Sequence, residues 1–364
     1  MLKIIDQGVI SKVPGRGAYM PTITLLPDGT YVAAQHVGAG LGTPDNHIEL
    51  LRSKDLKTWT NEGSVHDADD ELDKWCYRGP RVIVAPDGRW ALVSTRFEKG
   101  DTFNVQTEAV PTCELVLMWS GDQGRKWSKP QIVPVGYPSD QYTWNGTGYL
   151  LQISPKRWMF PFETWKPEGY TGLPNQVAGA VFSSDQGKTW GERTEFHRDR
   201  QVKKLWWDGA YAIMPNGDLI SLFWVHLYGT SEDTFNHWSI SKDQGRTWST
   251  PRPTNLRGQV CAPIPLKDGR VAAVYNYRHE PQGVHVALTK NFDHFDTDNE
   301  VKVFDASKEA TLGKPEAGTF IAEHMKIAFG KPSGMTLPNG DILTHFWCTT
   351  QGVTHTRWVR LKAE

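Results

Sequence analysis

The sequence predicts an all-β protein: a six-bladed β-propeller with Asp-box turns, formed as a single domain by residues 1–364. Three observations predict this fold. An apolar hairpin pattern occurs six times, an octet of the form Ser-x-Asp-x-Gly-x-x-Trp occurs three times, and no segment shows sustained helical periodicity. Repeats of this kind indicate sheets packed radially around an axis, an arrangement that hides most strand edges.

The hairpin pattern consists of an apolar strand, a Pro-Asp-Gly-like turn and a second apolar strand. It is clearest at residues 22–33 and 82–93. Further copies centre on residues 154–156, 215–217, 267–269 and 338–340. Asp-Gly and Asn-Gly supply the positive φ angles that two-residue hairpins need, so each copy predicts one hairpin. Six copies therefore predict six sheets.

The Asp-box octets follow later in each unit, at residues 120–127, 183–190 and 241–248. Residues 53–59 and 289–295 are degenerate copies, and the last unit has none that can be recognised. In each octet the Asp can accept backbone N–H bonds, the Gly can adopt a left-handed conformation, and the Trp can pack against the sheet. The octets are therefore predicted to be structural. The chain ends, residues 2–10 and 354–361, are predicted to share the last blade, which closes the ring.

Composition excludes several partners and cofactors. Lys and Arg number 40 against 41 Asp and Glu, so no global charge attracts nucleic acid or an anionic membrane. The four cysteines are scattered singly, and the histidines follow no ligand spacing, so we expect no metal and no cofactor. Residues 1–6 lack the features of a signal peptide, which predicts the cytoplasm if Met1 is native; a signal peptide removed beforehand would make the protein secreted or periplasmic.

Successive Asp-box turns, each preceded by the hairpin repeat, resemble the sialidase (neuraminidase) superfamily over nearly the whole chain. The resemblance implies a sialidase-like propeller with a sugar site in its central channel. It also implies three arginines on a sugar carboxylate, a Tyr nucleophile activated by a Glu, and an Asp that serves as acid and base.

Three positions match this pattern. Asp45, in the loop of residues 42–47, lies where the acid/base Asp is expected; the alternative is an Asp that caps its own loop. Arg78, in the segment 76–80, resembles an Asp-Arg-x-Pro element at the second blade. Arg278, in the segment 274–280, resembles the region where a further arginine meets the carboxylate, a role suited to a guanidinium fork.

Two positions depart from the pattern. Tyr19 stands where the first arginine is expected, with Arg16 displaced nearby. The opening of the last blade, residues 328–334, contains Lys331 but no Tyr to act as nucleophile. These departures argue against true sialidase chemistry.

Propeller topology gives further candidates without the resemblance. Loops that open each innermost strand and loops that follow the second strand meet at one end of the channel. Trp165 and Asn145 belong to this wider set. We predict as catalytic residues Asp45, Tyr277 and Glu280, and as substrate-binding residues Arg16, Tyr19, His36, Arg78, Arg96, Glu163, Trp207, Asp208, His226, Arg278 and Lys331.

This mixture of aromatic and charged side chains suits a sugar. The sequence thus predicts an exo-acting glycoside hydrolase for a terminal acidic sugar of a glycan or oligosaccharide. Asp45, Glu163, Asp208 and Glu280 are the carboxylates that topology places best for such chemistry. Two alternatives stay open: a polysaccharide lyase acting on uronate-containing glycans, and a non-catalytic carbohydrate-binding propeller.

Overall fold

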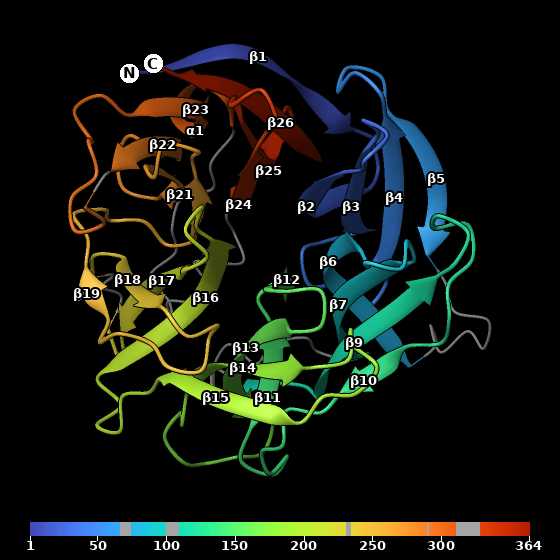
Figure 1. The fold of residues 1–364 in the computed structure, drawn as a ribbon, viewed down its shortest axis with the longest axis vertical. Helices are drawn as coiled ribbons and strands as arrows, with labels where there is room; N and C mark the ends of the chain where they lie inside the picture. Colours follow the sequence, from blue (N-terminus) through green and yellow to red (C-terminus); the bar gives the residue numbers. More distant parts are fainter. Residues whose placement is uncertain (66–73, 100–108, 231–233, 290, 311–327) are drawn as a thin grey trace.

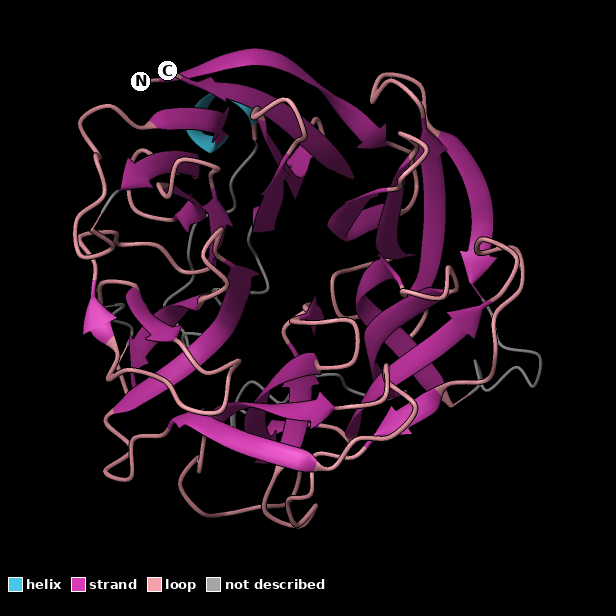
Figure 2. Ribbon diagram, in the orientation of Figure 1, coloured by secondary structure: helices cyan, strands magenta, loops and turns pink. Residues whose placement is uncertain are grey.

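The computed structural model describes residues 1–65, 74–99, 109–230, 234–289, 291–310 and 328–364. They form six sheets around a central axis, the predicted six-bladed propeller (Figure 1). Within these residues the only α-helix is α1 (Ala306–Glu309), and strands and loops make up the rest (Figure 2). None of the described segments forms a helix long and apolar enough to cross a membrane.

The blades are numbered in chain order, and the strands of each are given from the innermost outward. The first blade contains β2 (Gly17–Leu25), β3 (Tyr31–Gly38), β4 (His47–Ser53) and β5 (Thr60–Val65). The second contains β6 (Trp75–Val84), β7 (Trp90–Glu98), β9 (Cys113–Ser120) and β10 (Gln131–Val133). The third contains β11 (Thr143–Gly146), β13 (Trp158–Pro167), β14 (Ala178–Ser183) and β15 (Glu192–His197), and two short strands, β8 (Ala109–Val110) and β12 (Leu151–Gln152), also pair with β13.

The second half of the chain repeats this order. The fourth blade contains β16 (Lys204–Ile213), β17 (Leu219–Leu227), β18 (His237–Ser241) and β19 (Arg252–Pro253). The fifth contains β20 (Cys261–Pro265), β21 (Val271–Tyr277), β22 (Gly283–Thr289) and β23 (Val301–Asp305). The sixth contains β24 (Phe329–Thr336), β25 (Ile342–Thr350), β26 (Val353–Ala363) and β1 (Leu2–Ser11).

The N-terminal strand lies outermost in the sixth blade. It pairs antiparallel with β26 from Leu2 opposite Ala363 to Ser11 opposite Thr356. The two chain ends lie side by side (Figure 1), and the Met1 amino group donates to the Glu364 carbonyl at 2.7 Å. The first and last strands therefore join the two ends of the ring within one sheet.

The hairpin turns between first and second strands have the expected left-handed glycines. Gly29, Gly88, Gly217 and Gly340 have φ values between 81° and 92°, and Gly269 has a φ of 85°. The third blade makes its turn without a glycine, where the Ser154 N–H donates to the Arg157 carbonyl at 3.2 Å.

The Asp boxes hold the turns that follow the third strands. In the third blade, the Ser183 hydroxyl accepts the Gly187 N–H at 2.8 Å, and Asp185 accepts the Thr189 N–H at 2.9 Å. Hydrogen bonds to Asp185, first among them the one from the Thr189 hydroxyl at 2.6 Å, lower its pKa to about 2. Gln186 precedes the left-handed glycine and is itself left-handed, with a φ of 66°, which the motif alone did not predict.

Four innermost strands share a bulge near their start. The register shifts within β2, β6, β16 and β24, and each bulge contains one left-handed residue: Met20 (φ 46°), Gly79 (φ 58°), Asp208 (φ 50°) and Lys331 (φ 44°). Bulges re-aim side chains, and left-handed residues other than glycine are strained. Four blades therefore carry an equivalent bulge at the same end of the channel, and the backbone is strained in the three whose left-handed residue is not glycine.

Candidate functional site

A cavity lies where these bulges meet, at the end of the channel that the strand-opening loops surround. Its volume is about 150 Å³. All four left-handed bulge residues line it. The described residues around it are Met20, Leu41, Gly42, Arg78, Gly79, Phe97, Asn145, Gly146, Thr147, Gly148, Trp165, Asp208, Val260, Arg278, Gly330, Lys331 and Trp347.

Arg78 is a cation in this cavity that no carboxylate of the described residues neutralises. Its guanidinium lies 4.1 Å from the centroid of the Phe97 ring, and one terminal nitrogen donates to the Gly42 carbonyl at 3.0 Å. The Nε has no hydrogen-bond partner, and no carboxylate of the described chain pairs with this residue. Burial lowers the pKa of Arg78, although arginine stays protonated in proteins. Since buried charges are normally paired, an anion fits here.

Arg278 adds a second guanidinium from the fifth blade. A terminal nitrogen donates to the Phe329 carbonyl at 2.9 Å, and the guanidinium lies 5.2 Å from the centroid of the Phe329 ring. Arg278 lines the same cavity as Arg78. The two arginines come from different blades, so their side chains approach a shared space from separate directions.

Lys331 and Asp208 form an ion pair across the channel. Lys331 belongs to the sixth blade and Asp208 to the fourth, and the Lys331 ammonium donates to the Asp208 carboxylate. Burial acts to lower the pKa of Lys331, but the charge of Asp208 and this hydrogen bond outweigh it, so the pKa is raised. The Lys331 ammonium therefore keeps its charge at neutral pH.

Glu163 lies directly behind the cavity lining and is 2% exposed. Its carboxylate accepts hydrogen bonds from Asn145 Nδ2 at 3.1 Å, Trp165 Nε1 at 3.0 Å and the Asp208 N–H at 2.6 Å. Burial raises its pKa to about 7, and the negative charge of Asp208 contributes in the same direction. A carboxyl group with this pKa can hold or release a proton at neutral pH, as general acids do.

The structure brings five of the predicted residues together at the cavity. Arg78, Asp208, Arg278 and Lys331 line it, and Glu163 bonds to Asn145, Trp165 and Asp208, which line it too. Trp207 lies beside it, edge-on to Trp165 with ring centroids 5.3 Å apart.

The three residues predicted to be catalytic do not line this cavity. Asp45 is exposed, accepts the Ala39 N–H at 2.8 Å within its own loop, and borders a separate, more open hollow. Burial acts to raise the pKa of Asp45, but hydrogen bonds from Thr43 and Ala39 outweigh it and lower the pKa. This geometry agrees with the alternative of a loop-capping Asp.

Glu280 and Tyr277 lie at the edge of the fifth blade. Glu280 is exposed and accepts the Ser307 hydroxyl at 3.4 Å, next to α1. Tyr277 packs against His279 and His285, with ring centroids 5.4 and 5.2 Å away. These contacts join both side chains to residues of the fifth blade and of α1.

Three other predicted binding residues are held by partners of their own. Arg16 pairs with Glu49 through both terminal nitrogens, one of them at 2.9 Å. Arg96 pairs with Glu114 at 2.6 Å and lies 4.3 Å from the Trp75 ring centroid. His226 is 4% exposed on β17, 6.4 Å from the Trp224 ring. None of them lines the cavity.

Tyr19 and His36 contact the bulge of the second blade next to the cavity. Their rings stack with centroids 5.4 Å apart, and His36 Nδ1 accepts the N–H of Gly79, the bulge residue of the second blade, at 3.4 Å. Burial lowers the pKa of His36 to about 3, so the ring is neutral and can accept this bond. Through this bond the stacked pair braces the bulge beside Arg78.

Sequence reasoning missed several channel residues. Phe97 and Trp347 line the cavity, and each lies near the end of a second strand, so the topological rule could have found both. Arg81 lies deeper on β6, where its Nε donates to the Gly148 carbonyl at 2.7 Å and its guanidinium lies 4.7 Å from the Tyr149 ring. The topological rule considered only the loops at the ends of strands, so it did not select Arg81, which lies within β6.

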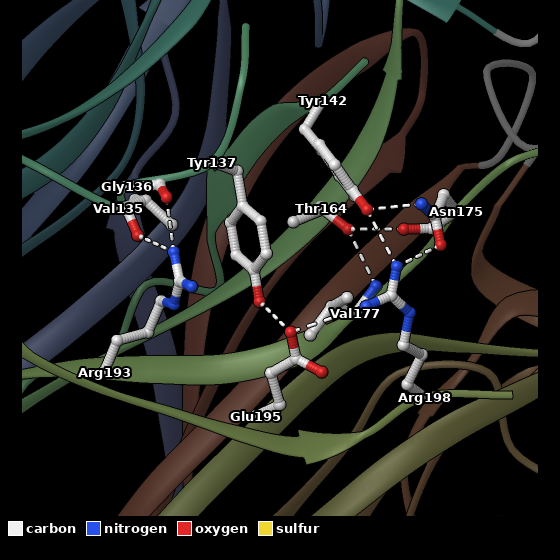
Figure 3. Close-up of polar contacts among 10 residues, drawn as sticks. All are labelled: Val135, Gly136, Tyr137, Tyr142, Thr164, Asn175, Val177, Arg193, Glu195 and Arg198. Atoms are coloured by element: carbon white, nitrogen blue, oxygen red, sulfur yellow. Dashed lines mark hydrogen bonds and ion pairs between the residues drawn. The ribbon is translucent and has the colours of Figure 1, made fainter. Parts of the chain in front are cut away.

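A polar network braces the loops of the third blade near this end (Figure 3). Arg198 donates to the Tyr142 hydroxyl at 2.7 Å and to the side-chain oxygen of Asn175. The Val177 N–H donates to the Thr164 hydroxyl at 2.7 Å. Tyr142 precedes β11, and Thr164 lies between Glu163 and Trp165. The network therefore fixes the strand ends that carry Asn145, Glu163 and Trp165.

Comparisons with solved structures agree with this fold. A protein of unknown function from Dyadobacter fermentans DSM 18053 is similar over 100% of this chain and 99% of its own, with a TM-score of 0.75 and 18% identity. An α-L-arabinanase from Penicillium chrysogenum, complexed with arabinobiose, is similar over 98% of both chains, with a TM-score of 0.67 and 13% identity. An intramolecular trans-sialidase from Ruminococcus gnavus, in complex with oseltamivir carboxylate, is similar over 94% of both chains, with a TM-score of 0.59 and 14% identity.

At these identities the likeness shows the fold alone, a sialidase-like six-bladed propeller that glycoside hydrolases also use. A search of the curated proteins finds no match. A family model described as a BNR repeat-like domain matches residues 29–310, which is most of the chain. The chain therefore belongs to the family of proteins with a BNR repeat-like domain.

Proposed function

We propose that the protein is a glycoside hydrolase that binds a terminal acidic sugar in the central cavity. One observation carries the proposal: Arg78, a cation that no described carboxylate neutralises, lines a cavity with Asp208, and the peptide N–H of Asp208 bonds to the Glu163 carboxyl behind that lining. An anionic group of the substrate would neutralise Arg78, and the two carboxyl groups would donate and accept the protons that hydrolysis requires.

The binding step uses the arginines and the aromatic rings. The carboxylate of the sugar lies between Arg78 and Arg278, since guanidinium forks bind carboxylates well. Phe97, Trp165 and Trp347 line the cavity and supply apolar faces for the sugar ring. The cavity volume of about 150 Å³ accommodates one ring, which suits attack on a terminal residue.

The chemical step uses the two carboxyl groups. Glycoside hydrolysis needs a proton on the leaving oxygen as the glycosidic C–O bond breaks, and a carboxylate that takes a proton from the attacking water. Asp208 lines the cavity, paired with Lys331, and serves the second role. Glu163 lies behind Asn145 and Trp165 and supplies the proton. The transfer passes through one bound water, a route that general acids can use.

A panel of aryl glycosides and oligosaccharides tests the proposal, with sialosides, uronides, rhamnosides and arabinosides as substrates. Asp208→Asn should lower kcat about 10²–10⁴-fold on the acidic substrate that the wild type cleaves. Asp45→Asn is the matched control and should keep wild-type kcat, because its carboxylate is bonded within its own loop. Full activity in Asp208→Asn, or a loss of activity in Asp45→Asn alone, would contradict the proposal and favour Asp45 as the acid/base residue.

A non-catalytic carbohydrate-binding propeller is a second candidate. It is favoured by the fact that Asp208 is paired with Lys331 and that Glu163 accepts from three donors. Binding of an acidic glycan that stays intact after long incubation would support it. A lyase has less support, because the described residues that line the cavity include neither Tyr nor His as a base. Ultraviolet absorbance from an unsaturated product would favour the lyase.

A further inference from the structure

We propose that Lys331 is a positioning residue, which holds Asp208 across the channel and, through Asp208, fixes the peptide N–H that bonds to Glu163. Its importance for turnover rests on the proposed function. The arrangement itself does not, because it is built from three side chains and one backbone group that the fold places together.

The ion pair bridges two blades that are not neighbours. The fifth-blade strand β20 packs against both β16, which carries Asp208, and β24, which carries Lys331. Lys331 therefore reaches over the opening of the fifth blade to meet Asp208. A surface lysine would keep its ammonium in water, whereas this one, 15% exposed along its side chain, is committed to a single partner.

Both partners lie in strained backbone. Asp208 and Lys331 are the left-handed residues of their bulges, with φ values of 50° and 44°. Lysine gains nothing locally from this conformation, since it lacks the short side chain with which Asp or Asn can bond to its own backbone. The contact that Lys331 makes in this conformation is with Asp208, so the ion pair offsets the strain at both bulges.

The same contact controls the environment of Glu163. The Asp208 N–H donates to Glu163 at 2.6 Å, so any shift of the Asp208 bulge moves this donor. The ionisable groups that act on Glu163 are Asp208 and Tyr211 from β16 and Lys331 from β24, while Asn145 and Trp165 are neutral donors. Of these groups, Asp208 raises the pKa of Glu163 and Lys331 lowers it. Without the ammonium, the negative charge of Asp208 would act on Glu163 without the opposing charge of Lys331.

The test follows the titration of Glu163 directly, by infrared spectroscopy of its carboxyl group, with Glu163→Gln subtracted as the blank. In Lys331→Met the apparent pKa of the carboxyl pair should rise by about 1–3 pH units, because Asp208 loses its opposite charge and its N–H is no longer held against Glu163. Lys331→Arg keeps the charge and should titrate like the wild type. Lys362→Met removes an exposed lysine on β26 and is the matched control.

A double-mutant comparison shows whether Lys331 acts through Asp208. The effect of Lys331→Met on Glu163 should be clearly smaller in an Asp208→Asn background. An equal effect in both backgrounds, or no shift in Lys331→Met, would overturn the proposal. If Lys331→Met fails to fold, the same titration is measured in Lys331→Gln, which retains a hydrogen-bond donor without the charge. Because the readout is a titration, it decides this inference even if no glycoside is ever cleaved.

Discussion

At the Asp-box end of the blades, each carboxylate accepts hydrogen bonds from its own turn. At the cavity end, Glu163 accepts hydrogen bonds from two side chains of the third blade and one backbone N–H of the fourth. Asp185 bonds to Ser183 and Thr189, all within one octet. Glu163 bonds to Asn145, to Trp165 and to the peptide of Asp208, 45 residues away. The pKa of Asp185 is lowered to about 2, and that of Glu163 is raised to about 7.

This difference shows what separates a structural carboxylate from a functional one on the same scaffold. The Asp-box carboxylate is partly exposed and accepts hydrogen bonds from several donors, so its charged form is favoured. The cavity carboxyl is buried beside another negative charge, so its neutral form is favoured despite three donors. The first arrangement stabilises a turn in its ionised state, and the second stores a proton.

The pH dependence of stability should therefore have opposite signs at the two ends. The folded protein holds the Glu163 proton up to a pH of about 7, whereas the unfolded chain releases it near 4.5. Between these values the folded state binds more protons, so stability falls as pH rises and is constant above. Glu163→Gln should remove this slope, which amounts to about 3 kcal/mol at most.

Chemical denaturation at several pH values between 4.5 and 8 measures that slope. Asp185→Asn is the matched variant at the other end. Its lowered pKa means that Asp185 stabilises the fold above its ordinary value of 3.8 and loses this contribution only as pH falls toward 2. A slope that is unchanged in Glu163→Gln would show that the proton is not stored there, and the comparison between the two ends would fail.

The fold was predictable because its signals are local. A Pro-Asp-Gly turn or an Asp box is contained in eight residues or fewer, and its hydrogen bonds join residues two to five positions apart. Such short-range chemistry can be read from a single chain. The left-handed Gln186 was not predicted, since no general rule assigns a positive φ to glutamine.

The site was predictable only in part, for the opposite reason. The topological rule identified Arg78, Asp208, Lys331 and Glu163 because a propeller brings strand openings together. It could not separate them from Arg16, since the pairing of Arg16 with Glu49 depends on folded contacts 33 residues apart. Asp45 was chosen because its position resembles that of the sialidase acid/base Asp, and the hydrogen bond that it accepts from the Ala39 N–H became visible only in three dimensions.

Arginine variants sharpen the comparison between a paired and an unpaired cation. Arg78→Met should raise KM for the acidic substrate about 10–100-fold, which corresponds to the loss of one or two charge-assisted hydrogen bonds. It should have little effect on a neutral glycoside or on stability, because no carboxylate of the described chain pairs with Arg78. Arg16→Met is the control: it strands Glu49 and should lower the melting temperature while leaving KM unchanged.

Steady-state kinetics and thermal unfolding of the two variants distinguish these outcomes. If Arg16→Met raises KM as much as Arg78→Met, the binding surface extends beyond the cavity and the boundary between the two kinds of arginine is wrong. If Arg78→Met affects acidic and neutral glycosides equally, the cavity does not select for charge.

The smallest expected effect concerns the Asp-box end alone. Gly187 and Gly217 both have left-handed backbones, with φ values of 79° and 87°. A Cβ on Gly187 would lie 3.0 Å from the ring of Trp158, which is fully buried, whereas one on Gly217 would meet nothing within 4 Å. Both alanine variants pay the backbone strain, but Gly187→Ala also overpacks the blade and should be about 1 kcal/mol less stable than Gly217→Ala. Denaturant unfolding measures this difference, and kcat/KM should be the same in both, since neither residue lies near the cavity. A change in kcat/KM for Gly187→Ala would mean that the turns and the cavity are energetically coupled along the blade.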